Sequence, residues 1–363
     1  MKVQSLTIRG YKSLRALEEF QLRNLNIIVG ANGAGKSNFL SFFKLASALA
    51  QGNLQTYVQL QGGPDALLYG TRKVTSELGM EIKFQPKGKV QNAYFATLTP
   101  TVDSRLIFND ESAWYSGYNE KTVHLGSGHS ESKLLKSAGQ PWIEGYVHGA
   151  LQSWKQYHFH DTSDSAAVKR PQSSSDNLVL KMAADNLAAY LLRLRLEYPA
   201  YYQRIVDTIK LAAPFFGGFV NRPVSDKIEL EWFEQRDPDT PYKAHVLSDG
   251  TLRFICLATL LMQPPELLPD TVLLDEPELG LHPYAINLLA DMLKQVAEEK
   301  QVLVATQSVE LLNCFKPEDV VVAERQDDAT ILKRLDTEEL KDWLEDYTLG
   351  ELWKRNIFGG RPA

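Results

Sequence analysis

The feature that most constrains the fold of this 363-residue chain is a glycine-rich loop between a strand-like and a helix-like segment. The apolar run 25–29 is typical of a buried strand, and residues 38–49 carry apolar side chains at helical spacing. The octapeptide Gly30-Ala-Asn-Gly-Ala-Gly-Lys-Ser37 joins them with the spacing of a phosphate-binding loop, which requires this strand-to-helix context. We therefore expect an α/β fold in which this loop lies at the edge of a sheet.

Each residue type in the loop suits the binding of a nucleoside triphosphate. Glycine lacks a Cβ atom, so the loop can curl and aim backbone N–H groups inward, and the following helix adds the positive end of its dipole. Lys36 is expected to pair with the β- and γ-phosphates, and the hydroxyl of Ser37 to ligate Mg²⁺. A tight turn with an exposed lysine is the structural alternative. The predicted ATP-binding residues of the loop are Gly30, Asn32, Gly33, Ala34, Gly35, Lys36, Ser37 and Asn38.

The apolar segment 271–274 reads as a strand that ends in two acidic residues, Asp275 and Glu276. Ligands of open α/β sheets bind beyond the carboxyl ends of the strands, so both carboxylates are expected at the nucleotide. Asp275 is the predicted magnesium ligand, and Glu276 is the predicted general base that polarises the attacking water. A solvated acidic turn is the alternative, and the upstream glycine-rich loop favours the catalytic interpretation.

A third motif, Leu247-Ser-Asp-Gly250, precedes the long apolar helical segment 251–262. Ser248 and Gly250 therefore lie at a helix start, where a hydroxyl and free N–H groups form an anion site. One nucleotide does not need two such sites in the same subunit. We expect this second site to contact the γ-phosphate of ATP held by another copy of the chain. Alternatively, Ser248 only caps a core helix.

These motifs, with the N-terminal run 1–13 and the run Asp275-Glu-Pro-Glu-Leu-Gly-Leu-His-Pro283, resemble the ABC-type ATPase heads of the RecF, SMC and OLD group. The nearest resemblance is to compact bacterial ATPases of the AAA family without a long insertion. It implies a P-loop NTPase with a two-lobed ABC/SMC-like head, a mixed sheet core, an antiparallel β subdomain and a helical arm. It also implies ATP and Mg²⁺ as cofactors, and a homodimer in which ATP is sandwiched between two heads.

The chain is expected to form a single head with five parts. They are lobe I with the phosphate loop at 1–95, a β-rich elaboration at 96–175, a helical arm at 176–213, lobe II at 214–308 and a C-terminal segment at 309–363. In the last part, Thr337–Tyr347 is predicted to form an amphipathic helix that starts at a threonine cap. It either closes lobe II or presents a docking surface. We expect no nuclease in this segment, because it lacks an Asp-x-Asp metal cluster.

The residue after the segment 302–306 departs from the pattern of the family. In ABC heads a phosphate-sensing histidine stands there, and this sequence has Gln307 instead. Glutamine hydrogen-bonds a phosphate or a water but cannot become positively charged. Gln307 is therefore a predicted catalytic residue of a slow enzyme. In heads of this kind a second glutamine usually links Mg²⁺ to the hinge between the lobes. The candidates for it in this sequence are Gln61 and Gln85, and no pattern around them singles out either one.

Two further positions are carried over from the resemblance. His282 lies where related heads place a loop across the dimer interface, and alternatively it begins a helix with Pro283 in the first position. Lys12 follows an aromatic residue near the first strand, where related heads have a basic residue that reaches the nucleotide. The alternative for Lys12 is a solvated charge at a sheet edge.

The composition of the chain places few further constraints on its function. The net charge is −6, so DNA binding is allowed on one face of a dimer but not required. The apolar runs are too short to cross a bilayer and no signal peptide is apparent, which predicts a cytoplasmic protein without a membrane partner. His158 and His160 share one face of an expected strand near Asp161, which suggests either a metal site or ordinary strand histidines.

Three functions are compatible with these observations. The first is an ATP-gated dimer that controls a separately encoded effector, plausible in defence against phage. The second is a RecF-like ATPase that binds DNA in repair or recombination. The third is a nucleotide-dependent scaffold that does not hydrolyse ATP, which the glutamine at 307 brings into consideration.

Overall fold

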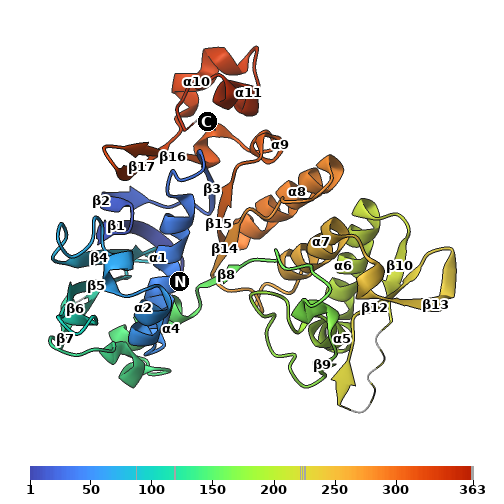
Figure 1. The fold of residues 1–363 in the computed structure, drawn as a ribbon, viewed down its shortest axis with the longest axis horizontal. Coiled ribbons are helices and arrows are strands. Elements are labelled where there is room, and N and C mark those ends of the chain that lie inside the picture. Colours follow the sequence, from blue (N-terminus) through green and yellow to red (C-terminus); the bar gives the residue numbers. More distant parts are fainter. Residues whose placement is uncertain (87, 118–119, 221, 223, 225, 361–363) are drawn as a thin grey trace.

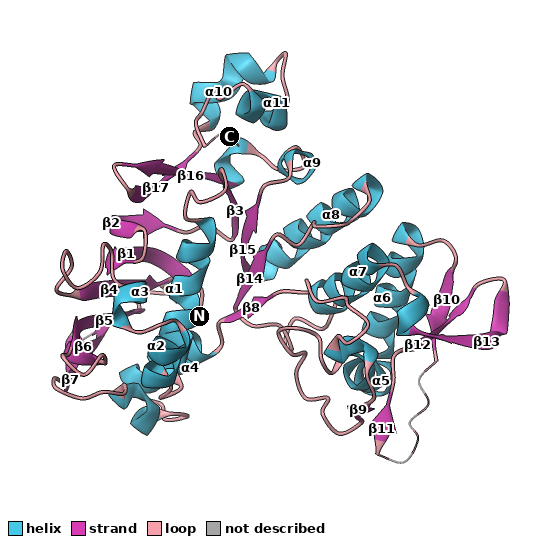
Figure 2. Cartoon of the chain, in the orientation of Figure 1, coloured by secondary structure: helices cyan, strands magenta, loops and turns pink. Residues whose placement is uncertain are grey.

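The structure, a computed structural model, describes residues 1–86, 88–117, 120–220, 222, 224 and 226–360. Two lobes flank a central sheet (Figure 1). One lobe contains an antiparallel sheet and the helices nearest the N-terminus, and the other is mainly helical (Figure 2). Among the described residues, no helix has the length and apolar character that crossing a membrane demands.

The central sheet has the strand order β17-β16-β3-β15-β14-β8. Five strands run parallel, and β17 pairs antiparallel with β16. Along β3 the side chains of Ile27 and Val29 enter one hydrophobic core, whereas Ile28 enters the other, so both faces of the sheet are covered. The strands are β3 Leu25–Val29, β8 Lys155–Tyr157, β14 Thr271–Asp275, β15 Gln301–Thr306, β16 Val320–Gln326 and β17 Ala329–Arg334.

The antiparallel sheet has the order β2-β1-β4-β5-β6-β7. It does not end near residue 95, because β5 crosses that position and pairs along its length with β4 and β6. The β-rich region expected at 96–175 also holds a helix, α4 (Ile143–Gln152), and the central strand β8, so it is not a separate β elaboration. The strands are β1 Val3–Tyr11, β2 Leu14–Gln21, β4 Leu78–Phe84, β5 Gln91–Pro100, β6 Leu106–Ser116 and β7 Lys121–Gly126.

Helix α1 (Lys36–Ala50) fills the space between the two sheets. The ring of Phe43 makes edge contacts with Phe39, Phe42 and Trp154, and the three phenylalanines are fully buried. Burying such rings is strongly favourable, so the helix that follows the glycine-rich loop is anchored on two sides. The short helices α2 (Leu54–Leu60) and α3 (Pro64–Leu67) complete this lobe.

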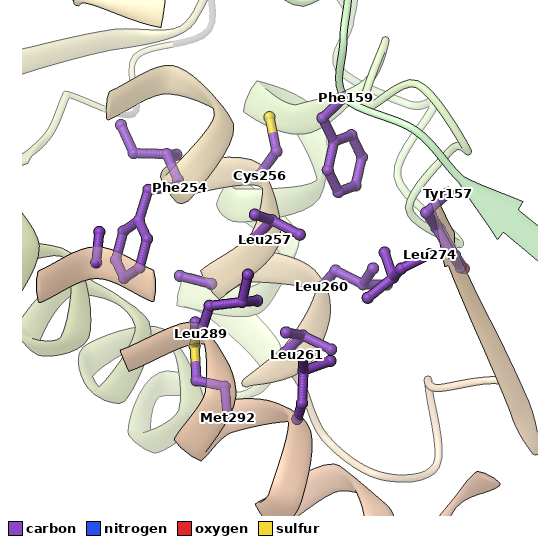
Figure 3. Packing of buried hydrophobic residues seen from close by; sticks show 14 of the residues in the cluster. Tyr157, Phe159, Phe254, Cys256, Leu257, Leu260, Leu261, Leu274, Leu289 and Met292 are labelled. Atoms are coloured by element: carbon purple, nitrogen blue, oxygen red, sulfur yellow. The ribbon is translucent and has the colours of Figure 1, made fainter. Parts of the chain in front are cut away.

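The other face of the central sheet is covered by α7 (Asp249–Leu261) and α8 (Pro283–Glu299). Figure 3 shows Leu257 and Leu260 of α7 in one apolar cluster with Leu274 of β14 and Leu289 of α8. Beyond them lie helices at the position of the expected arm, and small sheets. These elements are α5 Leu187–Glu197, α6 Pro199–Ala212, β9 Gln172–Ser173, β10 Phe216–Phe219, β11 Lys227–Ile228, β12 Glu231–Glu234 and β13 Asp237–Lys243.

The C-terminal segment adds to the central sheet and then returns to the core. Its helices are α9 (Val309–Leu312), α10 (Thr337–Leu344) and α11 (Leu349–Lys354). The predicted threonine cap of α10 is wrong, because the side chain of Asp336 accepts the hydrogen bond from the N–H of Glu338. Short 3₁₀ helices span Lys133–Ser137, Ala167–Lys169, Ala244–Val246 and Pro317–Asp319.

Candidate nucleotide-binding and catalytic site

The glycine-rich loop curls between β3 and α1 in a shape that only small residues allow. Gly33 and Gly35 have φ angles of 78° and 101°, in the left-handed region that favours glycine. A Cβ atom on Gly35 would lie 2.0 Å from the hydroxyl oxygen of Thr330. That hydroxyl donates to the carbonyl of Ala34 at 2.8 Å, so the C-terminal hairpin β16–β17 supports the loop from behind.

Lys36 is buried inside the loop that precedes it. Its Nζ donates to the carbonyl oxygens of Gly30 at 2.8 Å and Ala31 at 3.1 Å. Burial lowers the pKa of this amine, and the negative charges of Glu276 and Asp275 act in the opposite direction. The ammonium is therefore fixed between the loop and the carboxylates, where it can meet a phosphate without further ordering.

The two predicted magnesium ligands lie together. The hydroxyl of Ser37 hydrogen-bonds Asp275, which closes the distance between the start of α1 and the end of β14. Burial raises the pKa of Asp275, and the neighbouring charge of Glu276 raises it further. A hydroxyl and a carboxylate are the oxygen ligands that Mg²⁺ prefers, with phosphate oxygens completing the shell, so these residues fit the ion.

The predicted base and the predicted phosphate sensor also meet. Glu276 has a φ angle of 46°, which is uncommon for a residue with a side chain, and its N–H donates to the carbonyl of Ala305 at 2.8 Å. Its Oε1 accepts a hydrogen bond from Nε2 of Gln307. The end of β15 therefore positions the carboxylate that follows β14, and Gln307 is its direct partner.

Ser248 and Gly250 lie at the start of α7, as predicted. The Oγ of Ser248 accepts from the N–H of Thr251 at 3.2 Å, which makes it the N-cap of the helix. The residue is nevertheless exposed. The capping alternative is thus real, and it leaves the hydroxyl open to a ligand from outside the lobe.

The remaining predicted residues divide between the surroundings of the glycine-rich loop and the start of α8. Asn38 donates from Nδ2 to the hydroxyl of Ser13 at 2.8 Å, and Lys12, with a φ angle of 46°, lines the adjacent recess of about 720 Å³. Asn32 lines a second recess of about 470 Å³ formed by the loop and the β16–β17 hairpin. His282 is exposed and caps α8, with its Nδ1 accepting from the N–H of Tyr284 at 3.3 Å.

Neither glutamine suggested for the hinge lies at the carboxylates. Gln61 accepts a hydrogen bond from Nζ of Lys12 at 3.3 Å, and Gln85 follows β4 in the antiparallel sheet. The glutamine beside the predicted magnesium ligands is Gln156, whose Nε2 donates to Oδ2 of Asp275 at 3.3 Å. Sequence reasoning missed it because its position depends on the pairing of β8 with β14, where Gln156 lies opposite Leu273.

The region of the two histidines differs from the expectation. Strand β8 ends at Tyr157, so His158 and His160 follow the strand instead of sharing one of its faces. Asp161 accepts hydrogen bonds from the hydroxyl and N–H of Ser163. No group of three or more His, Cys, Asp or Glu side chains suited to a metal occurs in the described part of the chain.

A third acidic residue of the Asp-Glu-Pro-Glu run was also missed. Glu278 is buried, its Oε1 accepts from the hydroxyl of Thr306, and burial raises its pKa. The backbone N–H of Gln307 also donates to this carboxylate. Glu278 therefore holds the strand end that carries Gln307, a role that its place in the run could have suggested.

Taken together, the fold and the geometry of the site define a P-loop NTPase head of the ABC/SMC-like class. Two solved structures share the fold over nearly the whole of both chains. The Smc head bound to the C-terminal winged-helix domain of ScpA has a TM-score of 0.62 at 15% identity and covers 93% of this chain and 99% of its own. The Smc head with an extended coiled coil, from Pyrococcus furiosus and bound to the C-terminal domain of ScpA, has a TM-score of 0.61 at 15% identity, with coverage of 95% and 99%.

Residues 25–313 match the protein family described as "AAA domain, putative AbiEii toxin, Type IV TA system". The match spans most of the chain, and the protein belongs to this family. No curated protein matches the sequence. Family and fold together support a nucleotide-binding ATPase domain.

Proposed function

We propose that this protein binds ATP with Mg²⁺ in the glycine-rich cradle, dimerises around two such nucleotides and hydrolyses them slowly. The observation that carries the proposal is the convergence of Lys36, Ser37, Asp275 and Glu276 from separate segments on one opening of the loop. These are the groups that phosphoryl transfer to water needs: a phosphate cradle, magnesium ligands and a base.

Each residue has a chemical task in hydrolysis. Lys36 pairs with the β- and γ-phosphates, and Ser37 with Asp275 would hold Mg²⁺, which neutralises phosphate charge when bound. Glu276 accepts a proton from the attacking water, while the amide of Gln307 orients that water or the γ-phosphate. Ser248 and the N-terminal end of α7 contact the γ-phosphate of the nucleotide held by the partner subunit.

Turnover is slow in this account because Gln307 is neutral and hydrogen-bonds the base itself. A water must replace the amide at Glu276 before the carboxylate can act as a base. Replacing Gln307 with histidine, which can carry a positive charge beside the γ-phosphate, is expected to raise kcat severalfold in a phosphate-release assay. An unchanged hydrolysis rate in Gln307→His would contradict this explanation.

The engagement of Glu276 by Gln307 also favours a second candidate, a scaffold that binds ATP without hydrolysing it. The two candidates differ in one comparison. If the protein is an enzyme, wild type releases phosphate faster than Glu276→Gln, and the expected loss of rate in the variant is about 10²-fold. Undetectable phosphate release from both proteins would support the scaffold function.

We further propose that the ATP-bound dimer regulates a separately encoded effector, in a setting of defence against phage and in the cytoplasm. Two findings support this idea. The family description names a toxin and a toxin–antitoxin system, and the two Smc heads of similar fold are bound to another protein, ScpA. In this proposal the ATP-bound state switches the effector, so Lys36→Ala should uncouple it.

A co-expression experiment tests the effector. A neighbouring gene whose toxicity changes with this protein, and ceases to change with Lys36→Ala, supports regulation. DNA binding by the purified protein that strengthens with ATP and weakens steeply with salt would instead favour the RecF-like alternative.

A further inference from the structure

A single arginine connects the start of α7 to the turn after Asp275 and Glu276 and to the segment after β8. Arg253 lies in the first turns of α7, close after Ser248 and Gly250. Its Nη1 donates to the carbonyl of Leu279 at 2.8 Å, and its Nη2 donates to the carbonyl of His160 at 3.0 Å. One guanidinium thus joins three segments that are distant in sequence.

One accepting carbonyl lies in the turn after the two carboxylates, and the other lies after β8, whose Gln156 donates to Asp275. Leu279 lies three residues after Glu276, in the turn between β14 and α8. His160 follows β8, the strand that pairs with β14 beside Asp275. Arg253 also lines, with Asp275 and Glu276, a cavity of about 10 Å³. A change in the position of this guanidinium therefore acts on both sides of the magnesium site.

A second contact couples the same two regions through the backbone. A Cβ atom on Gly250 would lie 2.4 Å from the carbonyl oxygen of Gly280, so the start of α7 rests directly on the turn after Glu276. Gly280 has a φ angle of 77°, and a Cβ atom there would lie 2.8 Å from Nη1 of Arg253. The contact is close enough that neither partner can shift independently.

One donor of the Arg253 guanidinium is unpaired among the described residues. Its Nε is buried and has no hydrogen-bond partner among the described residues. An unpaired buried donor of a charged group is costly, and such groups persist where they serve a task. The two hydrogen bonds to the carbonyls of Leu279 and His160 offset that cost, and only a guanidinium supplies both of them in this geometry.

We propose that Arg253 is a positioning residue that transmits the arrival of the partner's nucleotide at Ser248 to Asp275 and Glu276 of its own subunit. The inference rests on the ATP-sandwich dimer proposed above. Ligation at the start of α7 pulls the guanidinium, which moves the turn after Glu276 and the segment after β8 together. Each nucleotide site is then activated by the nucleotide of the other site.

A double-mutant cycle on kcat tests this coupling. At saturating ATP, Ser248→Ala and Arg253→Met are each expected to lower kcat about tenfold, the scale of a typical coupling between sites. If the signal from Ser248 passes through Arg253, the double variant is no slower than the slower single variant. Binding of a fluorescent ATP analogue to each variant should stay within about twofold of wild type, because neither residue touches the nucleotide of its own cradle.

Two controls keep the test decisive. Arg195→Met removes an exposed arginine of α5 and should leave kcat unchanged, alone or with Ser248→Ala. Arg253→Lys keeps a donor but not the two-pronged geometry, so it should recover part of kcat. If thermal unfolding shows that Arg253→Met does not fold, Arg253→Lys replaces it in the cycle.

The outcomes separate this inference from the function on which it rests. Losses that multiply, giving a double variant about a hundredfold slower than wild type, would overturn the coupling while leaving the ATPase intact. A wild-type kcat for Arg253→Met would do the same. Wild-type protein that neither dimerises with ATP nor releases phosphate would instead overturn the proposed function, and the coupling with it.

Discussion

The glycine-rich loop and the Ser248 segment are both predicted anion sites at helix starts, yet the fold encloses one and exposes the other. Around the loop, Lys36 is buried and Gly35 lies against Thr330 of the C-terminal hairpin. Ser248 is exposed, and among the described residues its hydroxyl hydrogen-bonds only within the turn that it begins. The glycine-rich loop is thus organised by residues of its own subunit. The Ser248 segment has the exposure expected of a site that is completed by a nucleotide from another subunit.

The largest effect that this comparison predicts is on the enclosed site. Lys36→Ala should weaken binding of a fluorescent ATP analogue at least about a hundredfold, because a buried ammonium in contact with phosphate is lost. Lys44→Ala, on the exposed side of the same helix, is the matched control and should bind as wild type does. Binding by Lys36→Ala within twofold of wild type would mean that the loop is not the cradle.

A substitution at the exposed Ser248 should spare nucleotide binding and impair hydrolysis and dimerisation. Ser248→Arg places a bulky charge where the partner's nucleotide is expected, so binding by the monomer should persist while hydrolysis falls about tenfold or more. Light scattering should find no ATP-dependent dimer. Thr348→Arg, which removes another exposed N-cap, is the control and should still dimerise. Equal defects in the two variants would reduce Ser248 to a capping residue.

The sequence predicted where both sites lie but not the residues that connect them, and the reason is physical. Lys36, Ser37, Asp275 and Glu276 follow from local spacing, because a loop and a strand end carry their own chemistry. The start of α7 at Ser248 was likewise predictable from a cap before an apolar run. The residues that connect these sites were not predictable in this way.

Gln156 and Arg253 gain their contacts only through tertiary structure. Gln156 reaches Asp275 because β8 pairs with β14, and Arg253 reaches two carbonyls because α7 packs on the turn after Glu276. No spacing in the sequence encodes those pairings. The same limit explains the boundary expected at residue 95, since alternating residues on both sides of it gave no sign that β5 runs through as one strand.

Two glycines of the loop differ in how closely the C-terminal hairpin packs against them. Gly35→Ala should destabilise the protein by about 3 kcal/mol or more, because the new Cβ collides with Thr330 in addition to straining the backbone. Gly33→Ala meets nothing within 4 Å and should cost only about 1–2 kcal/mol of backbone strain. Chemical denaturation measures both. Equal losses would indicate that the hairpin does not support the loop.

The smallest expected effect is a gain in stability at the magnesium site. Burial raises the pKa of Asp275, so the ionised carboxylate lowers the stability of the nucleotide-free fold at neutral pH. Asp275→Asn should therefore raise the thermal midpoint by ~1–3 °C while abolishing hydrolysis. The gain should shrink as the pH falls through the raised pKa of the folded state, and it should vanish below 3.8, the ordinary Asp value, because the carboxyl of the wild type is then protonated in both states.

The exposed Asp291 provides the control for that comparison. It lies on α8, and the ion pair that it forms in the described part of the chain is with Lys294 at 3.4 Å. Asp291→Asn should therefore leave the thermal midpoint within about 1 °C of wild type, the scale of a surface pair. A fall in midpoint for Asp275→Asn at neutral pH would mean that the hydrogen bonds of the carboxylate outweigh its burial.

The most direct test of the whole account is a structure of Glu276→Gln in the presence of ATP and Mg²⁺. The shared-site account predicts a symmetric dimer in which the hydroxyl of Ser248 lies within hydrogen-bonding distance of the γ-phosphate bound to Lys36 of the other subunit. A nucleotide-loaded protein in which Ser248 faces solvent or its own lobe, remote from any nucleotide, would contradict it.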